Sequence, residues 1–232
     1  MRLDKYLVEC GIGSRKEVKK IIDNKLVSVN DKIISSSKEN VDEEKDIVKY
    51  RDEIIKYKKF RYYILNKKEG YITAVDDPKD KTVMDLLPEW VIKKDLAPVG
   101  RLDKDTEGLL LLTNDGQLNH RLLSPKSHVD KTYYAELENN ISEDDLEKLR
   151  KGVDIGGYVT MPALAEKIGD KKIHLTIKEG KFHQVKKMLE AVGNKVVYLK
   201  RISFGNLKLN DMELGEVREV KIEDIIWFFY NI

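Results

Sequence analysis

A loop at residues 98–108 places three carboxylates and an arginine directly before an apolar run. These side chains are Arg101, Asp103, Asp105 and Glu107. The apolar run, 109–112, has the length of a β-strand, and the Asn-Asp-Gly at 114–116 is typical of a turn, so we predict a buried strand that ends in a turn. Charged groups held close to a core need partners or a chemical task. The loop is therefore the first candidate for a functional site.

Several kinds of chemistry suit such a loop. The spacing of its carboxylates imitates the start of a calcium-binding loop, but the position that should carry a bidentate glutamate is Asn114, which disfavours calcium. An aspartyl nucleophile for phosphoryl transfer is a second interpretation. It lacks support because the sequence has no glycine-rich phosphate loop and no Walker lysine. An ordinary solvated turn is the third.

The loop and the strand after it also carry a long, nearly uninterrupted motif. It reads Gly-Arg-Leu-Asp-x-x-Thr-x-Gly-Leu-Leu-Leu-Leu-Thr-Asn-Asp-Gly over residues 100–116 and resembles the catalytic motif of the RsuA-type ribosomal RNA pseudouridine synthases. Enzymes of this type break the N1–C1′ bond of a uridine within RNA, rotate the base and rejoin it through C5. The reaction needs no metal and no redox cofactor, so the resemblance implies none for this chain.

The resemblance implies three catalytic residues. Asp103 would be the ionised carboxylate that attacks the sugar or abstracts its proton, and a nearby cation would keep it charged. That cation falls on Lys186, where many relatives have arginine, and a lysine offers a point charge in place of a bidentate fork. Tyr133 matches the tyrosine that stacks on the target uracil and is a candidate to help remove the C5 proton. The alternatives are an exposed cation at 186 and an ordinary sheet aromatic at 133, while Asp105 and Glu107 are assigned to loop structure.

Substrate contacts are implied for three further residues, Arg101, Gln184 and Leu199. Arg101 matches the arginine thought to fill the gap left by the extruded base, since a guanidinium can stack and can bind phosphate. Gln184 belongs to the same His-Gln-Val-Lys motif as Lys186. Leu199 resembles the apolar residue that packs on the other face of the uracil, with core packing as the alternative.

The first 50 residues predict a small RNA-binding unit. Ser14-Arg15-Lys16-Glu17 has the form of a capping box, and Val18 and the isoleucines at 21–22 supply the inward face of the helix that it begins. The other side of this helix is cationic and could follow a phosphate backbone; its residues are Arg15, Lys16, Lys19 and Lys20. The layout Arg-Leu-Asp-Lys-Tyr-Leu … Gly-x-x-Ser-Arg resembles the alpha-L RNA-binding module. A solvated helix face is the alternative for the four cations.

Strand and helix patterns follow each other in mixed order after residue 61, which favours an α+β fold with a mixed, largely antiparallel sheet flanked by helices. The predicted domains are an alpha-L RNA-binding domain at 1–50, a charge-rich linker at 51–60 and a pseudouridine synthase catalytic domain at 61–232. Strands at 62–66 and 71–75 are predicted to open the catalytic domain as a hairpin. An apolar helix at 222–230 is predicted to close it.

Composition restricts the other classes of function. Hydrophobic residues make up 41% of the sequence, and no apolar run approaches the ~20 residues that span a bilayer. Cys10 is the single cysteine, which excludes an intramolecular disulfide and a zinc site built from cysteines. The first residues have an early acid and no apolar stretch of a signal peptide, so we expect a cytoplasmic protein. Because the net charge is only +2, any RNA contact must come from local basic patches.

Three functions fit these observations. The first is site-specific conversion of uridine to pseudouridine in 16S ribosomal RNA, because Glu-Gly-Lys-Phe-His-Gln-Val-Lys at 179–186 is closer to the small-subunit enzymes of the family. The second is the same reaction on 23S ribosomal RNA. The third, a non-catalytic RNA-binding factor in ribosome assembly, is disfavoured because Asp103, Tyr133 and Lys186 are all present. We expect a monomer whose partner is ribosomal RNA, alone or in a small-subunit assembly intermediate, with no membrane contact, metal or small-molecule cofactor.

Overall fold

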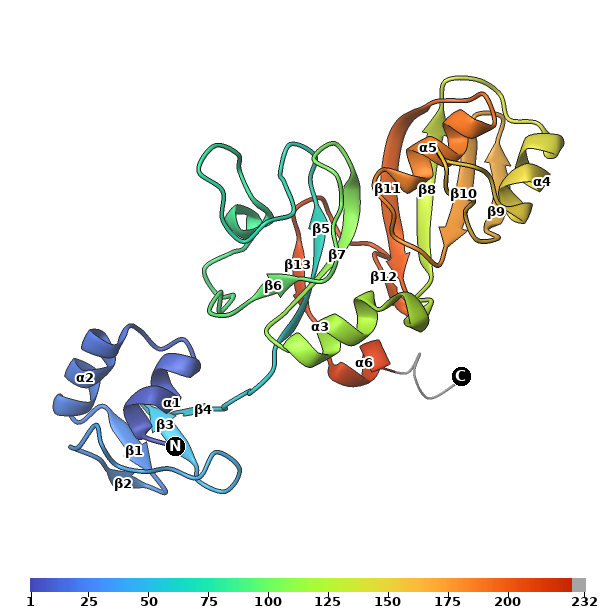
Figure 1. Ribbon diagram of the computed structural model, residues 1–232. Coiled ribbons are helices and arrows are strands. Elements are labelled where there is room, and N and C mark those ends of the chain that lie inside the picture. Colours follow the sequence, from blue (N-terminus) through green and yellow to red (C-terminus); the bar gives the residue numbers. More distant parts are fainter. Residues whose placement is uncertain (227–232) are drawn as a thin grey trace. The chain divides into compact units, whose positions relative to one another are not determined.

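The computed structural model describes residues 1–226, and the chain divides into two compact units, Met1–Phe60 and Arg61–Ile232 (Figure 1). Buried apolar side chains form one cluster in the first unit and two in the second. Each unit therefore has a core of its own, as an independent domain does. Within the described residues, no helix is long and apolar enough to cross a membrane.

The first unit packs two helices against a small antiparallel sheet. Its elements are α1 (Leu3–Glu9), α2 (Arg15–Asp23), β1 (Val27–Val29), β2 (Lys32–Ile33), β3 (Val48–Tyr50) and β4 (Glu53–Ile55). The strand order is β2-β1-β3-β4. Leu7 of α1 and Val18 and Ile22 of α2 are fully buried in the core of this unit. The apolar spacing seen in the sequence is thus the spacing that joins the helices to the sheet.

Part of the segment that the sequence analysis assigned to a linker, 51–60, belongs to the first unit. β4 pairs antiparallel with β3. The Tyr6 hydroxyl donates to the Ile55 carbonyl at 2.8 Å and accepts from the Tyr57 amide at 3.2 Å. The strand was missed because it is short and lies at the edge of the sheet, where charged side chains are tolerated and no two-residue period is needed.

The second unit is built on one nine-stranded sheet. Its strands are β5 (Tyr62–Lys67), β6 (Ala97–Pro98), β7 (Glu107–Thr113), β8 (Lys131–Leu137), β9 (Leu164–Gly169), β10 (Lys172–Ile177), β11 (Val196–Phe204), β12 (Leu207–Lys208) and β13 (Val217–Glu219). The main order is β13-β5-β7-β11-β8-β10-β9, with β6 paired to β7 and β12 to β11. The β7–β11 ladder is parallel and the other ladders of this sheet are antiparallel. The predicted α+β class with a largely antiparallel sheet is confirmed.

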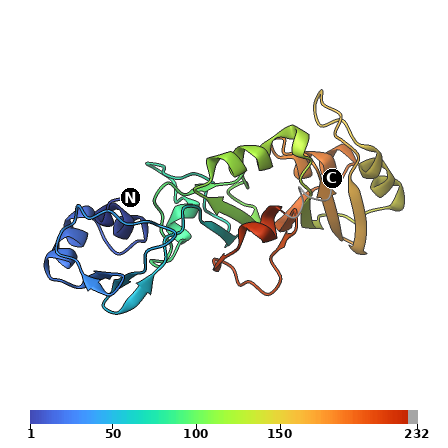
Figure 2. The same ribbon diagram turned by 90° about the horizontal axis from the view of Figure 1, so that it is seen from below.

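Two groups of helices pack on this sheet. They are α3 (Gly116–Leu123), α4 (Glu143–Lys151), α5 (Gln184–Ala191) and α6 (Ile222–Ile226), and short 3-10 turns occur at Val83–Leu86 and Pro125–Ser127. Leu146 of α4 and Met188 of α5 are buried in one apolar cluster, while Leu118 of α3 and Ile225 of α6 are buried in the other. Figures 1 and 2 show α4 beside β9, away from α3 and α6. One apolar cluster thus joins α4 and α5 to the sheet, and the other joins α3 and α6 to it.

The leucine run of β7 is buried on both faces of the sheet. Leu110 and Leu112 belong to the cluster of α4 and α5, whereas Leu109 and Leu111 belong to the cluster of α3 and α6. Successive side chains of a strand point to opposite faces, so a strand covered on both sides needs apolar residues at every position. This confirms the buried strand predicted from the sequence and explains why its residues do not alternate.

Gly108 allows β7 and β11 to approach each other closely. Its φ is +107°, and a Cβ at this position would lie 2.2 Å from the Arg201 carbonyl oxygen and 2.6 Å from the Arg201 nitrogen. No side chain fits in that space, and the backbone conformation itself favours glycine. The glycine therefore brings the end of the 98–106 loop directly beside β11.

One predicted element differs from the structure, and another is described only in part. Residues 71–75 form no strand: Ile72 makes an isolated bridge with Thr82, and the segment turns toward the 98–106 loop. The segment was mispredicted because its β-branched residues suit a strand, whereas tertiary contacts decide its path. The predicted helix at 222–230 is present as α6, Ile222–Ile226, and residues 227–230 lie outside the described part of the chain.

Candidate active site

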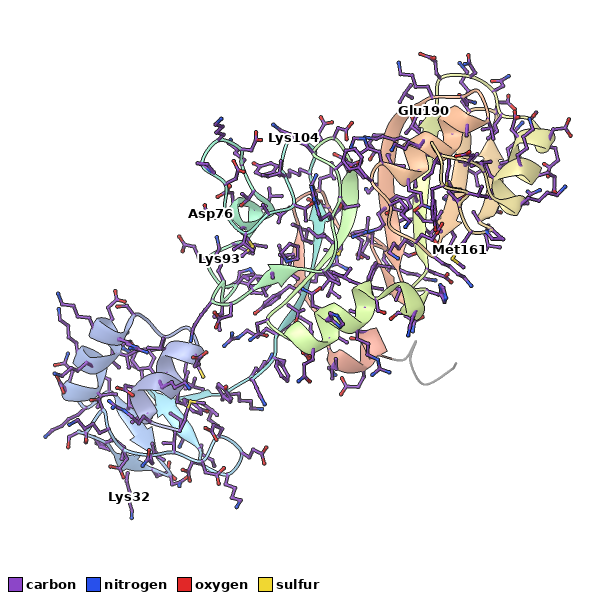
Figure 3. The ribbon with its side chains drawn as sticks, viewed as in Figure 1. Lys32, Asp76, Lys93, Lys104, Met161 and Glu190 are labelled. Carbon is purple, nitrogen blue, oxygen red and sulfur yellow. The ribbon has the colours of Figure 1, made fainter. Side chains whose placement is uncertain are left out.

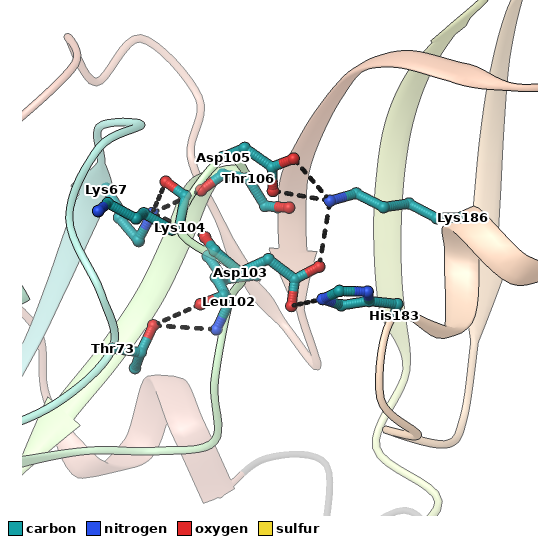
Figure 4. A network of polar contacts seen from close by, with 9 residues as sticks. All are labelled: Lys67, Thr73, Leu102, Asp103, Lys104, Asp105, Thr106, His183 and Lys186. Carbon is teal, nitrogen blue, oxygen red and sulfur yellow. Dashed lines mark hydrogen bonds and ion pairs between the residues drawn. The ribbon is translucent and has the colours of Figure 1, made fainter.

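A buried lysine forms hydrogen bonds with the backbone of the loop between β6 and β7. Lys67, the last residue of β5, is completely buried. Its Nζ lies 2.7–3.3 Å from four carbonyl oxygens, those of Lys68, Asp103, Lys104 and Thr106. Figure 4 draws the last three of these residues. Burial lowers the pKa of Lys67 to about 8, although the nearby carboxylates of the loop act in the opposite direction. The ammonium therefore fixes the backbone that carries Asp103.

Two further contacts hold this loop in place. Thr73 Oγ1 donates to the Leu102 carbonyl at 2.7 Å and accepts from the Leu102 amide at 3.1 Å. Lys104, labelled in Figure 3, pairs with Asp80 at 2.6 Å on the outer side of the loop. With Lys67 and Thr73 bonded to its backbone, the loop presents the Asp103 side chain in one fixed direction.

Asp103 faces two basic side chains from the start of α5. Its Oδ2 lies 3.3 Å from Lys186 Nζ, and its Oδ1 lies 3.6 Å from His183 Nε2 (Figure 4). Lys186 also bonds Asp105, with its Nζ 2.7 and 2.9 Å from the two carboxylate oxygens. This bond holds the pKa of Asp105 below its ordinary value. The lysine and the aspartate that the sequence singled out are thus brought together, and the lysine is shared with a second aspartate.

The turn before α5 is organised by Gln184. The residue is buried; its Nε2 donates to Glu179 Oε2 at 2.9 Å and its Oε1 accepts from the Lys181 amide at 2.9 Å. Glu179 in turn accepts from the Tyr158 hydroxyl and from the Met161 amide. Because both ends of the Gln184 amide are already bonded within the protein, its geometry suits positioning of the turn. The substrate contact predicted for Gln184 would require these bonds to open.

A cleft of about 650 Å³ opens beside Asp103 and is lined by all six residues of the predicted catalytic and substrate-binding set. Tyr133 of β8 and Leu199 of β11 form part of its wall and are only 8% and 5% exposed. Arg101 lies exposed on the loop at the mouth of the cleft. Within the described residues, no hydrogen bond engages the Tyr133 hydroxyl, whereas the Tyr134 hydroxyl donates to Glu136 outside the cleft. The cleft thus offers a carboxylate, a cation, an aromatic ring and an apolar wall.

Comparison with known proteins decides what this arrangement is. The sequence profile of the RNA pseudouridylate synthase family matches residues 61–191, and that of the S4 domain matches residues 1–48. The chain belongs to the RNA pseudouridylate synthase family. This confirms the resemblance drawn from the motif at 100–116 and places an S4 domain where an alpha-L RNA-binding module was predicted.

Relatives of this family resemble the chain over most of its length. It is 49% identical over 231 residues to an uncharacterized RNA pseudouridine synthase of Bacillus subtilis, covering 97% of both proteins. It is 45% identical over 168 residues to the ribosomal small subunit pseudouridine synthase A of Escherichia coli K12, covering 71% of this chain and 72% of that protein. A crystal structure of a pseudouridylate synthase superposes with a TM-score of 0.68 at 35% identity, covering 98% of this chain and 99% of the other.

The S4 domain of this pseudouridylate synthase presents the predicted cationic face. Ser14 Oγ accepts from the Glu17 amide, and the Glu17 carboxylate accepts from the Ser14 amide at 2.8 Å, which completes the capping box at the start of α2. The four basic residues of the face are exposed, and none forms an ion pair with another described residue: Arg15, Lys16, Lys19 and Lys20. Cations without bonded partners are available for phosphate.

Sequence reasoning missed three features at the synthase's cleft or beside it. Lys67 was placed in a hairpin turn, whereas it is the buried last residue of β5. Asp105 was assigned to loop structure, but it bonds Lys186 more closely than Asp103 does. Phe182, 69% exposed at the cleft, stacks on the His183 ring with centroids 3.7 Å apart. Among the described residues, no group of three or more His, Cys, Asp or Glu side chains could hold a metal ion.

Proposed function

We propose that this protein converts a specific uridine of 16S ribosomal RNA to pseudouridine. The observation that carries the proposal is the Asp103 carboxylate, held 3.3 Å from Lys186 Nζ in a cleft that also contains Tyr133 and Leu199. Relatives named ribosomal small subunit pseudouridine synthase A support the choice of RNA; one from Vibrio cholerae is 38% identical over 232 residues and is covered completely. No metal or small-molecule cofactor takes part in the proposed reaction.

Asp103 would act as the nucleophile or base of the reaction. The Lys186 ammonium, 3.3 Å from Asp103 Oδ2, would orient the carboxylate toward the ribose. Lys67 fixes the backbone of the loop, so little reorganisation is needed when the carboxylate meets the ribose of the target nucleotide. After the N1–C1′ bond has broken, the free uracil rotates in the cleft and rejoins the sugar through C5.

The walls of the cleft suit a flipped uracil. Tyr133 would stack on one face of the base, and its hydroxyl, which is not engaged by any described residue, is free to take part in removal of the C5 proton. Leu199 would pack on the other face. Arg101, exposed at the mouth, would occupy the space that the base leaves in the RNA, which offsets part of the unstacking cost of a few kcal/mol.

The RNA itself would be bound by both units. The exposed cations of α2 would contact phosphates of the RNA and fix its register. We propose that the protein acts as a monomer. We place this activity in the cytoplasm, on 16S ribosomal RNA or on a small-subunit assembly intermediate that contains it.

The test is release of tritium from RNA labelled at uridine C5, on separate 16S and 23S transcripts. The wild type is expected to release tritium from 16S RNA, and Asp103→Asn is expected to lower the rate on the order of 10⁴-fold. Asp105→Asn is the matched control, because it removes a carboxylate bonded to the same lysine. Equal losses in the two variants would overturn the role of Asp103, and release from 23S RNA alone would overturn the choice of substrate. If the transcripts are silent, the same assay on a partly assembled small subunit decides whether the protein is an enzyme.

A further inference from the structure

Arg201 is a buried arginine whose hydrogen bonds are incomplete. The residue is 2% exposed, and its Nε donates to the Leu109 carbonyl at 2.8 Å. Its Nη2 is buried and has no hydrogen-bond partner among the described residues, although the side chain lines the cleft. A buried guanidinium nitrogen without an acceptor is unfavourable, so this atom needs a partner that enters from the cleft.

A second cation lies beside it. Lys131, at the start of β8, lines the same cleft and donates to the Val129 carbonyl at 2.8 Å, which uses one of the three donors of its ammonium. Both cations contact one ring: Lys131 Nζ and Arg201 Cζ lie 5.6 and 5.3 Å from the centroid of Phe204. Burial and the charge of Arg201 lower the pKa of Lys131 to about 8. Two neighbouring cations of this kind form a site for an anion.

The acidic groups nearby do not fill this role. Glu179 already accepts from Tyr158, the Met161 amide and Gln184. Asp130 precedes Lys131 in the chain, has a buried carboxylate oxygen without a partner, and does not line the cleft. The cleft at this end therefore presents hydrogen-bond donors whose acceptors are not supplied by the described protein.

The position of the two cations identifies the anion. Arg201 of β11 lies opposite Tyr133 of β8 in the antiparallel ladder, and cross-strand neighbours have their Cβ atoms roughly 4.5–5.5 Å apart. Leu199, two residues before Arg201, lines the same cleft. A group bound by Arg201 is thus a near neighbour of the base held between Tyr133 and Leu199. In a polynucleotide, the anion next to a base is the phosphate of its own nucleotide.

We propose that Arg201 and Lys131 form a phosphate subsite that binds a backbone phosphate flanking the flipped uridine. The proposal rests on the proposed function in taking RNA as the source of the phosphate. Arg201 supplies the buried, preorganised donor, and Lys131 supplies a second donor and charge. Binding of the phosphate satisfies Nη2 and separates the two positive charges by an anion. The subsite fixes the ribose of the target nucleotide, and through it the C1′ atom, relative to Asp103.

The first experiment measures binding of three probes by NMR at millimolar concentrations: uridine, uridine 3′-monophosphate and uridine 5′-monophosphate. One of the two monophosphates is expected to bind wild-type protein about tenfold more tightly than uridine does, since a hydrogen bond to a charged group contributes about that much. Lys131→Gln is expected to reduce the difference, because only the Arg201 contact to the phosphate remains. Lys178→Gln is the matched control, because Lys178 is an exposed lysine at the same cleft. Equal binding of all three probes, or the same loss in the control, would overturn the proposal.

The second experiment uses 16S transcript and separates this proposal from the proposed function. Lys131→Gln is expected to lower the salt slope of RNA binding by about one unit relative to Lys178→Gln, as loss of one phosphate contact does. Arg201→Lys, which keeps the charge and loses the fork, is expected to lower kcat/KM while the fold is retained by circular dichroism. A phosphate preference without modification of any transcript would support the subsite and refute the activity. Modification with an unchanged salt slope would refute the subsite and support the activity.

Discussion

Lys186 lies closer to Asp105 than to Asp103: its Nζ is 2.7 Å from Asp105 Oδ1 and 3.3 Å from Asp103 Oδ2. One ammonium therefore serves two carboxylates, of which the side chain of Asp105 is 70% exposed and that of Asp103 only 29%. The exposed contact is readily replaced by water, whereas the inner one is shielded. Asp105 can thus hold the Lys186 side chain in place until substrate enters. When water leaves the cleft, the attraction between the Lys186 ammonium and the Asp103 carboxylate becomes stronger than that between Lys186 and Asp105.

Arginine at position 186 is expected to preserve activity. Its fork can bond both carboxylates at once, while the lysine divides one point charge between them. We expect Lys186→Arg to stay within about threefold of the wild-type kcat, and Lys186→Gln to lose about 10²-fold, the effect of removing one charge-stabilising donor. Tritium release under single-turnover conditions measures both. A larger loss in the arginine variant than in the glutamine variant would contradict the shared-charge arrangement.

The pKa of Asp105 is expected to depend on Lys186. The hydrogen bond from Lys186 holds this pKa below its ordinary value of 3.8, so the bond stabilises the fold at pH values above 3.8 and is lost as the pH falls through the lowered value. Carboxyl carbon NMR should show the pKa of Asp105 rising toward 3.8 in Lys186→Met. Asp211 is the internal control, because its pKa is lowered by Arg218 and should not move.

Removal of the Lys67 ammonium should affect stability and catalysis together. Lys67→Met leaves four buried or partly buried carbonyls without their shared donor, and we expect the free energy of unfolding to fall by about 2–4 kcal/mol. The rate of tritium release should fall as well, because Asp103 loses its fixed backbone. Urea denaturation measures the first effect. Lys68→Met, a change at the exposed neighbour, serves as control and should alter neither quantity.

The wild type and Lys67→Met are also expected to differ in how their stability depends on pH. The pKa of Lys67 is about 8 in the folded protein and has an ordinary value of 10.5, so the unfolded chain binds more protons between these pH values. Below pH 8 the buried Lys67 is charged, and the cost of removing its ammonium from water lowers the free energy of unfolding by its full amount. This cost shrinks as the pH rises toward 10.5. The stability of the wild type relative to Lys67→Met is therefore expected to increase from pH 8 to pH 10. A difference that falls over this interval would contradict the depressed pKa.

The sequence predicted the elements whose patterns are local. Three features were predicted correctly: the capping box at Ser14, the buried strand after Gly108 and the pairing of Asp103 with Lys186. The pairing was predicted from the family motif. Tertiary context decided the rest. β4 was hidden because an edge strand tolerates charge, and the role of Lys67 depends on four carbonyls that only the fold brings together. The unpartnered Nη2 of Arg201 is likewise a property of packing, with no pattern in the sequence to reveal it.

The cationic face of α2 gives a prediction for the whole chain. Its lysines are exposed and form no ion pair with the described residues, so each one bound to a phosphate releases a counterion from the RNA. Replacement of Lys16, Lys19 and Lys20 by glutamine is expected to lower the slope of log K against log salt by about 2–3 units, at roughly 0.7–0.9 per phosphate contact. The control replaces three exposed lysines elsewhere in the same unit: Lys25, Lys32 and Lys38. Filter binding to 16S transcript between 50 and 200 mM salt, conditions typical for such slopes, measures both triple variants. An equal change in the two would assign the affinity to net charge and remove the specific role of α2.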